Sequence, residues 1–345
     1  MSSHRVTQRL ALVALLALTG SEAAACDFCT GGGRKFRSLQ LEVESNATVA
    51  LAHPIGRNRF KVEKVLHGRL AVGAEVVIEA RLFFVPGATF LLLGEEAEAT
   101  RVIVLRGAAA AFVEKLTDLP VDRTARLQFF LPYLTDSDPY IAASARQEFA
   151  DAPYAEVKKL KPHMTPETFL KALASRSTPR ASRGILLLMV GVSGSTKHIE
   201  KLEPWLADET LQQKPDYDAL IAAYLLLRGP DGLAKMREVV AAIDENSRAR
   251  PAIAFMKALR FHEREEKVLA RAQIIATLRW LLRYPAFADA TLFELQRHED
   301  WEALPLVIEL YEKHAEAHPS ITRPVQDYSR ACPGKEAAEF MESIK

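Results

Sequence analysis

The chain has 345 residues, with 45 basic and 44 acidic side chains and a net charge of +1 at pH 7. This balance provides no excess of basic charge for a nucleic-acid surface, so we expect no nucleic-acid partner. Hydrophobic residues make up 49% of the chain, and its 16 Gly and 18 Pro do not gather into a long linker. Such a composition is that of a folded protein and excludes wholesale disorder.

Residues 1–25 have the three parts of a secretory signal peptide. A basic start precedes the apolar run Leu10–Leu18, and the small residues Ala23–Ala25 stand before Cys26. The apolar run is too short to span a bilayer as a helix. We therefore expect export to the periplasm, the cell envelope or the extracellular space, without a transmembrane helix.

Two kinds of processing fit this junction. Small residues at Ala23 and Ala25 suit a general signal peptidase, which would release a soluble protein that begins at Cys26. A run of small residues that ends at a cysteine also suits lipoprotein processing, in which Cys26 is acylated. The large aliphatic residue that is usual three places before that cysteine is replaced by Ala23. A soluble form and a lipid-anchored form both remain open.

The short segment 26–34 contains two of the three cysteines, Cys26 and Cys29. Their spacing is that of redox-active pairs, but such pairs act at the start of a helix in a βαβ fold, which the sequence lacks. Thr30 replaces the histidine of a covalent haem site. We interpret the pair as a disulfide, or Cys26 as a lipid attachment point, and Cys332 as a buried, inert thiol. A metal or redox role is the remaining alternative.

Residues 35–107 are expected to form mainly β structure. Five apolar runs are separated by glycine-rich turns, at 47–54, 60–66, 76–78, 89–93 and 102–105. We expect the first strand to stop at Pro54. Short strands with glycine-rich corners predict a small five-stranded β-barrel-like domain, either closed or partly open. A linker, 108–121, follows it.

Two segments of this region, Phe60–Gly73 and Gly87–Gly94, resemble strands of secreted barrels of the netrin/metalloproteinase-inhibitor type. The resemblance implies a barrel and covers only this part of the chain. In inhibitors of that family a processed N-terminal cysteine chelates the zinc of the target, which implies the same position for Cys26. Those inhibitors have Cys-x-Cys, whereas this chain has Cys-x-x-Cys.

Residues 122–345 show a helical hydrophobic period. The first apolar stripe comprises Leu127, Phe130, Leu131 and Leu134. Asp138 is expected to cap the next helix, with Pro139 at its first position. The phrase Leu134–Phe149 resembles the core of a HEAT repeat.

Later helices recur at a regular spacing. They are expected to begin near Lys197, Asp231, Glu266 and Trp301, roughly 34–36 residues apart, which is in the range of helical repeats. In such repeats the helices come in pairs, and each helix pair needs neighbouring pairs to bury its apolar face. The fold class predicted is therefore α+β and mostly α, with a barrel-like domain followed by a HEAT-like α-solenoid over 122–345.

The whole layout is similar to a group of secreted, planctomycete-type bacterial proteins. In that group a leader ends in Ala-Cys-x-Phe-Cys, a small β domain follows, and helical repeats complete the chain. The resemblance is carried by Ala25–Cys29, Phe149–Tyr154, Tyr224–Leu233, Leu259–His262 and Arg330–Pro333. The group brings no known activity, so the resemblance supports the architecture alone.

The histidines favour structural roles. His314 and His318 have the spacing of a metal-binding pair, but the glutamate of a metalloprotease signature directly follows the first histidine, and here Glu316 does not. We expect both to act as cations near a helix C-terminus. His298–Asp300 and His262–Glu263 are expected to be solvated polar faces.

No nucleophile elbow, phosphate-binding glycine loop or paired-cysteine zinc framework occurs in the sequence, so no catalytic residue, cofactor or metal ligand is assigned. Solenoids commonly bind other proteins. By this fold-level analogy we expect an exported protein-interaction or scaffold protein of the bacterial envelope, with another protein as partner and no enzymatic activity. The alternative is an extracytoplasmic enzyme or protease inhibitor with a site at the barrel–solenoid junction.

Overall fold

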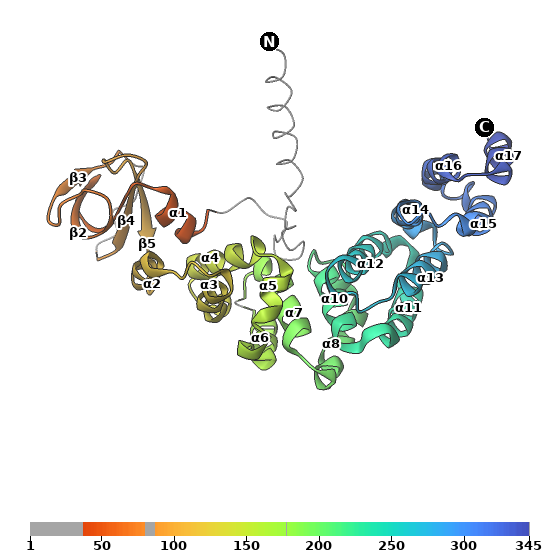
Figure 1. Ribbon diagram of the computed structural model, residues 1–345, viewed down its shortest axis with the longest axis horizontal. Helices are drawn as coiled ribbons and strands as arrows, with labels where there is room; N and C mark the ends of the chain where they lie inside the picture. The colour runs from red at the N-terminus through yellow and green to blue at the C-terminus, as the bar shows by residue number, and fades with distance from the viewer. Residues whose placement is uncertain (1–36, 80–86, 177, 345) are drawn as a thin grey trace, which may run out of the picture.

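The computed structural model describes residues 37–79, 87–176 and 178–344, so the expected signal peptide and the segment with Cys26 and Cys29 lie outside it. Within the described residues the chain is mostly helical, with one small β-sheet at its N-terminal end. The helices follow one another along a curved row that leads away from the sheet (Figure 1). No helix in the described ranges combines the length and the apolar character needed to cross a membrane.

The first described element is a helix, α1 (Leu39–Ser45). We had expected mainly β structure in residues 35–107, so this helix was not predicted. Leu39, Leu41 and Val43 alternate with polar residues as in a strand. Ser38 nevertheless starts a helix, because its Oγ accepts the backbone N–H of Leu41 at 3.1 Å. Leu39 and Val43, one turn apart, are buried, whereas Leu41 is 44% exposed.

The five expected strands form one antiparallel sheet. They are β1 (Thr48–Gly56), β2 (Arg59–His67), β3 (Glu75–Val77), β4 (Thr89–Gly94) and β5 (Arg101–Leu105). Their order in the sheet is β3-β2-β1-β4-β5, which makes β1 the central strand. Ala52 of β1 is opposite Val62 on one side and Phe90 on the other.

The five expected strands are confirmed as one sheet, but the sheet is open and does not close into a barrel. Strands β3 and β5 form opposite edges, and no pairing between them occurs in the described residues. Strand β3 has three residues and pairs with only one end of β2. Closure needs tilted, staggered strands that meet along their length. Instead, one face of the sheet packs on helices through Val49, Leu91 and neighbouring residues, and the other has a separate cluster around Phe60 and Phe90.

Strand β1 also continues beyond Pro54, where we expected it to stop. Proline cannot donate a ladder hydrogen bond, so it is tolerated where a strand has no neighbour on its N–H side. Strand β4 pairs with β1 only as far as Ala52. The strand can therefore extend to Gly56 and enter a tight turn, in which Asn58 has φ 61°.

The expected linker 108–121 contains a helix, α2 (Ala109–Lys115), and a 3-10 turn, η1 (Leu116–Asp118). Phe112 of α2 packs edge to face against Tyr133, with ring centroids 4.8 Å apart. Residues of the sheet, α2 and the following helices belong to one continuous hydrophobic cluster. The sheet and the helical region therefore share a core.

The remaining helices are α3 (Arg123–Phe130), α4 (Pro139–Ala150), α5 (Tyr154–Lys159), α6 (Pro166–Ala174), α7 (Arg180–Ser193), α8 (Ile199–Ala207), α9 (Glu209–Gln212), α10 (Tyr217–Arg228), α11 (Gly232–Ala242), α12 (Ala249–Phe261), α13 (Arg271–Leu281), α14 (Ala288–Arg297), α15 (Leu304–His314), α16 (Thr322–Ala331) and α17 (Lys335–Ser343). The apolar stripe predicted around Leu127 is buried. Asp138 caps α4 by accepting the N–H groups of Tyr140 and Ile141, and Pro139 is the first helical residue, as predicted.

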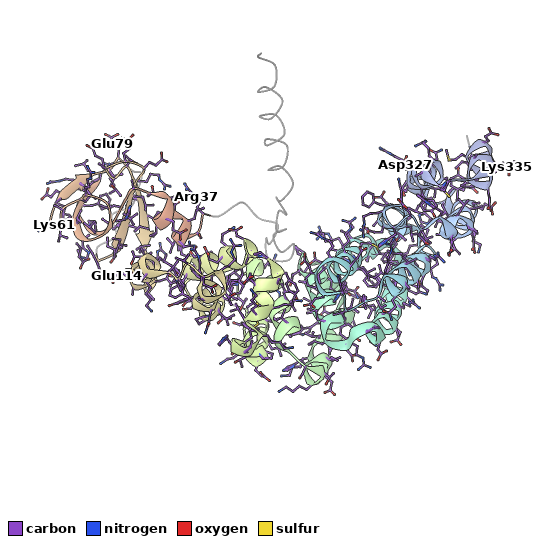
Figure 2. All side chains as sticks on the ribbon, in the orientation of Figure 1. Arg37, Lys61, Glu79, Glu114, Asp327 and Lys335 are labelled. Carbon is purple, nitrogen blue, oxygen red and sulfur yellow. The ribbon has the colours of Figure 1, made fainter. Side chains whose placement is uncertain are left out.

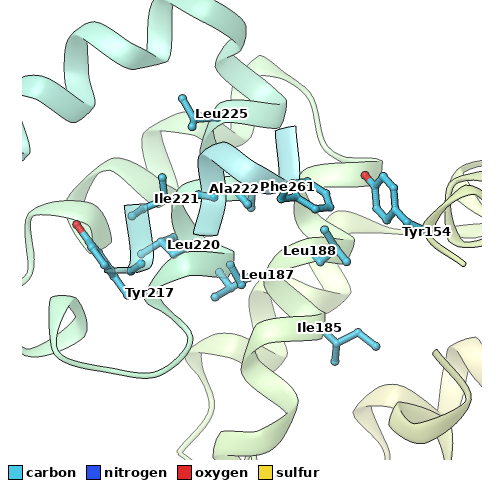
Figure 3. Close-up of a cluster of buried hydrophobic side chains, with 14 of the residues drawn as sticks. Tyr154, Ile185, Leu187, Leu188, Tyr217, Leu220, Ile221, Ala222, Leu225 and Phe261 are labelled. Carbon is cyan, nitrogen blue, oxygen red and sulfur yellow. The ribbon is translucent and has the colours of Figure 1, made fainter. Parts of the chain in front are cut away.

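Alternate helices pack in series: α7 on α10, α10 on α12, α12 on α14 and α14 on α16. Figure 3 shows apolar side chains of α7 and α10, with Phe261 from α12, gathered in one part of this core. Helices begin close to Lys197, Asp231 and Trp301, as predicted, but not at Glu266. Glu266 ends a π-helical turn, η7 (His262–Glu266), because Lys267 adopts a left-handed conformation with φ 51°, and α13 starts only at Arg271.

Gly191 allows α7 and α10 to approach each other closely. A Cβ atom at this position would lie 2.9 Å from the Cα of Ala223 and 2.7 Å from Cδ1 of Leu226. Alanine normally stabilises a helix interior relative to glycine. Here we expect Gly191→Ala to lower the free energy of unfolding by about 1–3 kcal/mol, because the two helices must move apart. Urea unfolding followed by circular dichroism measures the change, and a stabilised variant would contradict the close contact.

Candidate functional site

Of the cysteines discussed above, only Cys332 lies in the described residues. It follows α16, is 8% exposed, and its Sγ lies 3.7 Å from the carbonyl oxygen of Pro333. Burial raises the pKa of the Cys332 thiol, which disfavours the reactive thiolate. The predicted burial of Cys332 is confirmed. The disulfide or lipid attachment at Cys26 and Cys29 stays a prediction.

His262, His298 and Asp300 are buried, so the expectation that they are solvated is wrong. His262 lies where α12 passes into the π-helical turn, on the side that packs against α10. Its Nε2–H donates to the carbonyl oxygen of Ala222 at 3.1 Å. His298 and Asp300 lie in the turn after α14, which folds back on its neighbours. Glu299, between them, is exposed as expected.

One group of side chains has the composition of a metal site. The ligand atoms of Glu263, Glu294 and His298 all lie within 4.8 Å of one another. Arg297 donates to Glu294 at 2.9 Å and also pairs with Glu263, and Arg260 pairs with Glu294. The arginines thus supply the positive charge that a cation would bring. We interpret the group as an ion-pair network that ties α12 and the π-helical turn to α14, and we assign no metal ligand.

The second histidine pair lies at the end of α15. His314 is in the last turn of this helix, as expected, whereas His318 lies four residues beyond its end, before the 3-10 turn η10 (Pro319–Ile321). The ring centroids of His314 and His318 are 6.2 Å apart. His318 Nε2 lies 3.3 Å from the carboxylate of Glu245, in the 3-10 turn η6 (Glu245–Ser247). This contact brings the end of α15 to the start of α12.

Near this contact, arginines alternate with aromatic rings on one surface. The arginine–aromatic surface consists of Arg237 on α11, Arg248 at the start of α12, Trp280 on α13, and Arg283 and Tyr284 in the turn that follows. The guanidinium carbons of Arg237 and Arg283 lie 5.5 and 4.9 Å from the Trp280 ring centroid. That of Arg248 lies 4.8 Å from Tyr284, and the two rings are themselves 5.5 Å apart.

The three guanidinium groups form no ion pair with any residue in the described ranges. The Nε atoms of Arg237 and Arg248 are buried and have no hydrogen-bond partner there. Arg283 donates its Nε–H to the carbonyl oxygen of Trp280 at 3.0 Å, so only its terminal nitrogens remain available. A guanidinium on an aromatic face keeps its planar N–H edge free for an anion. The surface is therefore suited to carboxylate groups.

A cleft of about 310 Å³ adjoins this surface between α13 and α15. Arg283 lines the cleft together with Arg279, Lys313, His314 and one acidic residue, Glu309, and its apolar lining residues are Leu282, Leu306 and Leu310. Arg279 is already paired with Asp300 and Glu302, and Lys313 with Glu309. Arg283 is the arginine that the cleft and the arginine–aromatic surface have in common.

Sequence reasoning missed this surface. Trp280, Arg283 and Tyr284 share one side of a helical turn by their three- and four-residue spacing, which is a weak local signal. Arg237 and Arg248 come from other helices, and only the packing of α11, α12 and α13 brings them to the rings.

Comparison with known proteins adds no assignment. No protein-family model matches the chain, and no curated protein or solved structure is detectably similar to it. The functional argument therefore depends on the chemistry of the surfaces and pockets themselves.

Proposed function

We propose that this is an exported protein-interaction or scaffold protein of the bacterial envelope, whose arginine–aromatic surface binds an acidic segment of another protein. The proposal of export is supported by the pattern of residues 1–25. We further propose that the helical part is a HEAT-like solenoid. The serial packing of α7, α10, α12, α14 and α16 supports this, because repeats of that kind contact mainly their neighbours.

The observation that carries the proposal is the absence of carboxylate partners from Arg237, Arg248 and Arg283 within the described residues. Several other arginines of the helical region do pair with carboxylates, as Arg279 does with Asp300. A stacked guanidinium is already oriented, so it loses less conformational freedom when it binds a carboxylate through two parallel hydrogen bonds. A partner with acidic side chains would complete the surface.

The neighbouring cleft favours a protein segment over other anions. Leu282, Leu306 and Leu310 line it beside Arg283, and Leu306 is 38% exposed. A peptide can place an apolar side chain there while its carboxylates meet the arginines. The net charge of +1 argues against a nucleic-acid partner, which needs many phosphate contacts.

A labelled peptide of alternating glutamate and leucine, measured by fluorescence anisotropy, tests the proposal. We expect Arg248→Ala to weaken binding about tenfold, because one charge-assisted contact is lost. Arg248→Lys should recover only part of the affinity, since lysine lacks the planar fork. The matched control is Arg57→Ala, which removes an exposed arginine from the β1–β2 turn and should leave affinity unchanged.

Circular dichroism confirms that each variant is folded. Affinity for the acidic peptide should fall as salt is raised, because the contacts are ionic. Equal binding of a peptide with glutamine in place of glutamate would contradict the proposal. Binding of a single-stranded oligonucleotide as tight as that of the acidic peptide would also contradict it.

The alternative function, an extracytoplasmic enzyme or protease inhibitor, has one observation in its favour. A pocket of about 300 Å³ lies where the N-terminal part of the chain meets the helices. Its described lining contains neither histidine nor cysteine, and Arg126 bridges its two glutamates, Glu44 and Glu148. These features favour ligand binding over nucleophilic catalysis.

A further inference from the structure

The pocket where the N-terminal part of the chain meets the helices, called here the junction pocket, lies between α1, α3 and the end of α4. Its volume of about 300 Å³ is at the lower end of the range for small-molecule sites. Residues from three separate parts of the chain form it, and they divide into a polar wall and an apolar rim. This site is distinct from the arginine–aromatic surface and shares no lining residue with it.

The polar wall is built around Arg126 of α3. Its NH2 group lies 2.9 Å from Oε1 of Glu44 on α1, and its Nε lies 3.1 Å from Oε2 of Glu148 on α4. The second oxygen of each glutamate accepts no hydrogen bond from the described residues. Arg126 therefore holds two carboxylates in place and leaves one acceptor on each of them.

Gln40 adds a third unsatisfied acceptor. This residue lines the pocket from α1 and is only 1% exposed. Its Oε1 is buried and has no hydrogen-bond partner among the described residues. A buried amide oxygen without a donor destabilises a protein by about 1–3 kcal/mol, so such atoms are normally paired. A ligand that donates hydrogen bonds would satisfy it.

The charges that line the pocket leave an excess of negative charge. Glu44, Glu148 and Asp151 are opposed by Arg123 and Arg126. Burial raises the pKa of Glu148, against the opposing effect of Arg126, and Glu44 and Asp151 raise it further. The wall thus carries more carboxylate than its arginines neutralise, and a cation bound there would favour the ionised form of Glu148.

The rim of the pocket is apolar. Leu41 of α1 is 44% exposed, and Val121, before α3, is fully exposed. Because both side chains line the pocket and are exposed, an apolar body can cover them while a charged group reaches the polar wall. Exposed residues of this kind at a concave site are typical of binding positions.

We propose that the junction pocket binds a primary alkylammonium group carried on a short apolar chain. The ammonium donates hydrogen bonds to the free oxygens of Glu44 and Glu148 and to Gln40, and the chain lies against Leu41 and Val121. Such a group occurs in a free amine and in a lysine side chain. Three donors on one compact cation match three acceptors.

Isothermal titration calorimetry with n-butylammonium chloride tests this inference on the purified full chain. We expect binding of n-butylammonium and none of n-butanol, which has the same apolar chain without the charge. Glu148→Gln should weaken binding about tenfold, as for the loss of one charge-assisted hydrogen bond. Glu44→Gln, at a more exposed position, should give a similar loss and serves as a second variant if Glu148→Gln fails to fold.

The matched control is Glu79→Gln, because Glu79 is an exposed glutamate on the sheet domain, outside the pocket (Figure 2). The Glu79→Gln variant should bind n-butylammonium with the same affinity as the wild type. Affinity of the wild type should rise with pH through the raised pKa of Glu148, and this dependence should disappear in Glu148→Gln. The alkylammonium stays charged up to about pH 10, so the pH effect belongs to the protein.

Nα-acetyl-lysine methylamide separates the two sources of the ligand. Binding as tight as that of n-butylammonium would identify a lysine side chain of a partner, and much weaker binding would identify a free amine. Either result supports the inference. Binding of n-butanol as tight as that of n-butylammonium, or an unchanged affinity in folded Glu148→Gln and Glu44→Gln, would overturn it.

Discussion

Ile221→Ala is expected to lower the free energy of unfolding by about 2–5 kcal/mol, the range for deletion of a large buried aliphatic side chain. Ile221 is fully buried in α10, which packs on α7 and on α12. Figure 3 shows it in the same cluster as Leu187 and Leu188. Because neighbours from two helices surround it, little of the cavity can collapse. Urea unfolding followed by circular dichroism gives the change, provided that the slope with urea is constant.

The matched control is Ile253→Ala on α12, where the isoleucine is 55% exposed. Exposed substitutions usually change stability by no more than about 0.5 kcal/mol. Alanine also has the higher helix propensity, so the control should be neutral or slightly stabilising. A loss of stability in Ile253→Ala as large as that in Ile221→Ala would contradict the assignment of α10 to the core.

The helical period expected over residues 122–345 includes α10, but the period does not show how deeply this helix is buried. The sequence shows one stripe, which includes Leu220 and Tyr224, and the structure buries Ile221, Ala222 and Leu225 as well. A single stripe suits a helix that packs on one neighbour. Helix α10 has neighbours on two sides, and that arrangement depends on residues far away in sequence.

The strands were predictable because their apolar runs are bounded by turn residues, and all five occur. Closure of the sheet into a barrel was not predictable, because closure depends on whether the two edge strands pair with each other. The short strand β3 and the packing of α1 and α2 on one face lead to an open sheet. Helix α1 was not predicted, because the apolar residues Leu39, Leu41 and Val43 alternate with polar residues. This pattern fits a strand as well as a helix.

Neither candidate site could be predicted from the sequence, for the same physical reason. Glu44 and Glu148 pair with the same arginine, Arg126, only once α1, α3 and α4 have packed together. Arg237 and Arg248 reach Trp280 and Tyr284 only through helix packing. Each residue alone resembles an ordinary surface charge. The signal lies in charges that lack partners after folding, which a sequence pattern does not record.

His262 is expected to make the protein less stable in mild acid. Burial lowers the pKa of His262 from 6.5 to about 4, although the hydrogen bond to the carbonyl of Ala222 opposes this shift. Between these values the unfolded chain binds a proton that the folded chain does not, so the free energy of unfolding falls as the pH falls. The stability present above pH 6.5 is lost progressively down to pH 4, by about 3 kcal/mol in all.

The measurement is urea unfolding at a series of pH values from 7 to 4, on the wild type and on His262→Leu. Glu148 has a raised pKa and contributes the opposite slope, but it is present in both proteins and cancels in their difference. We expect the wild type to lose about 3 kcal/mol more than His262→Leu over this range. His67→Gln, which changes an exposed histidine at the end of β2, should follow the wild type. Parallel pH profiles for wild type and His262→Leu would mean that His262 is protonated in the folded protein, and the π-helical turn would then have to open to admit water.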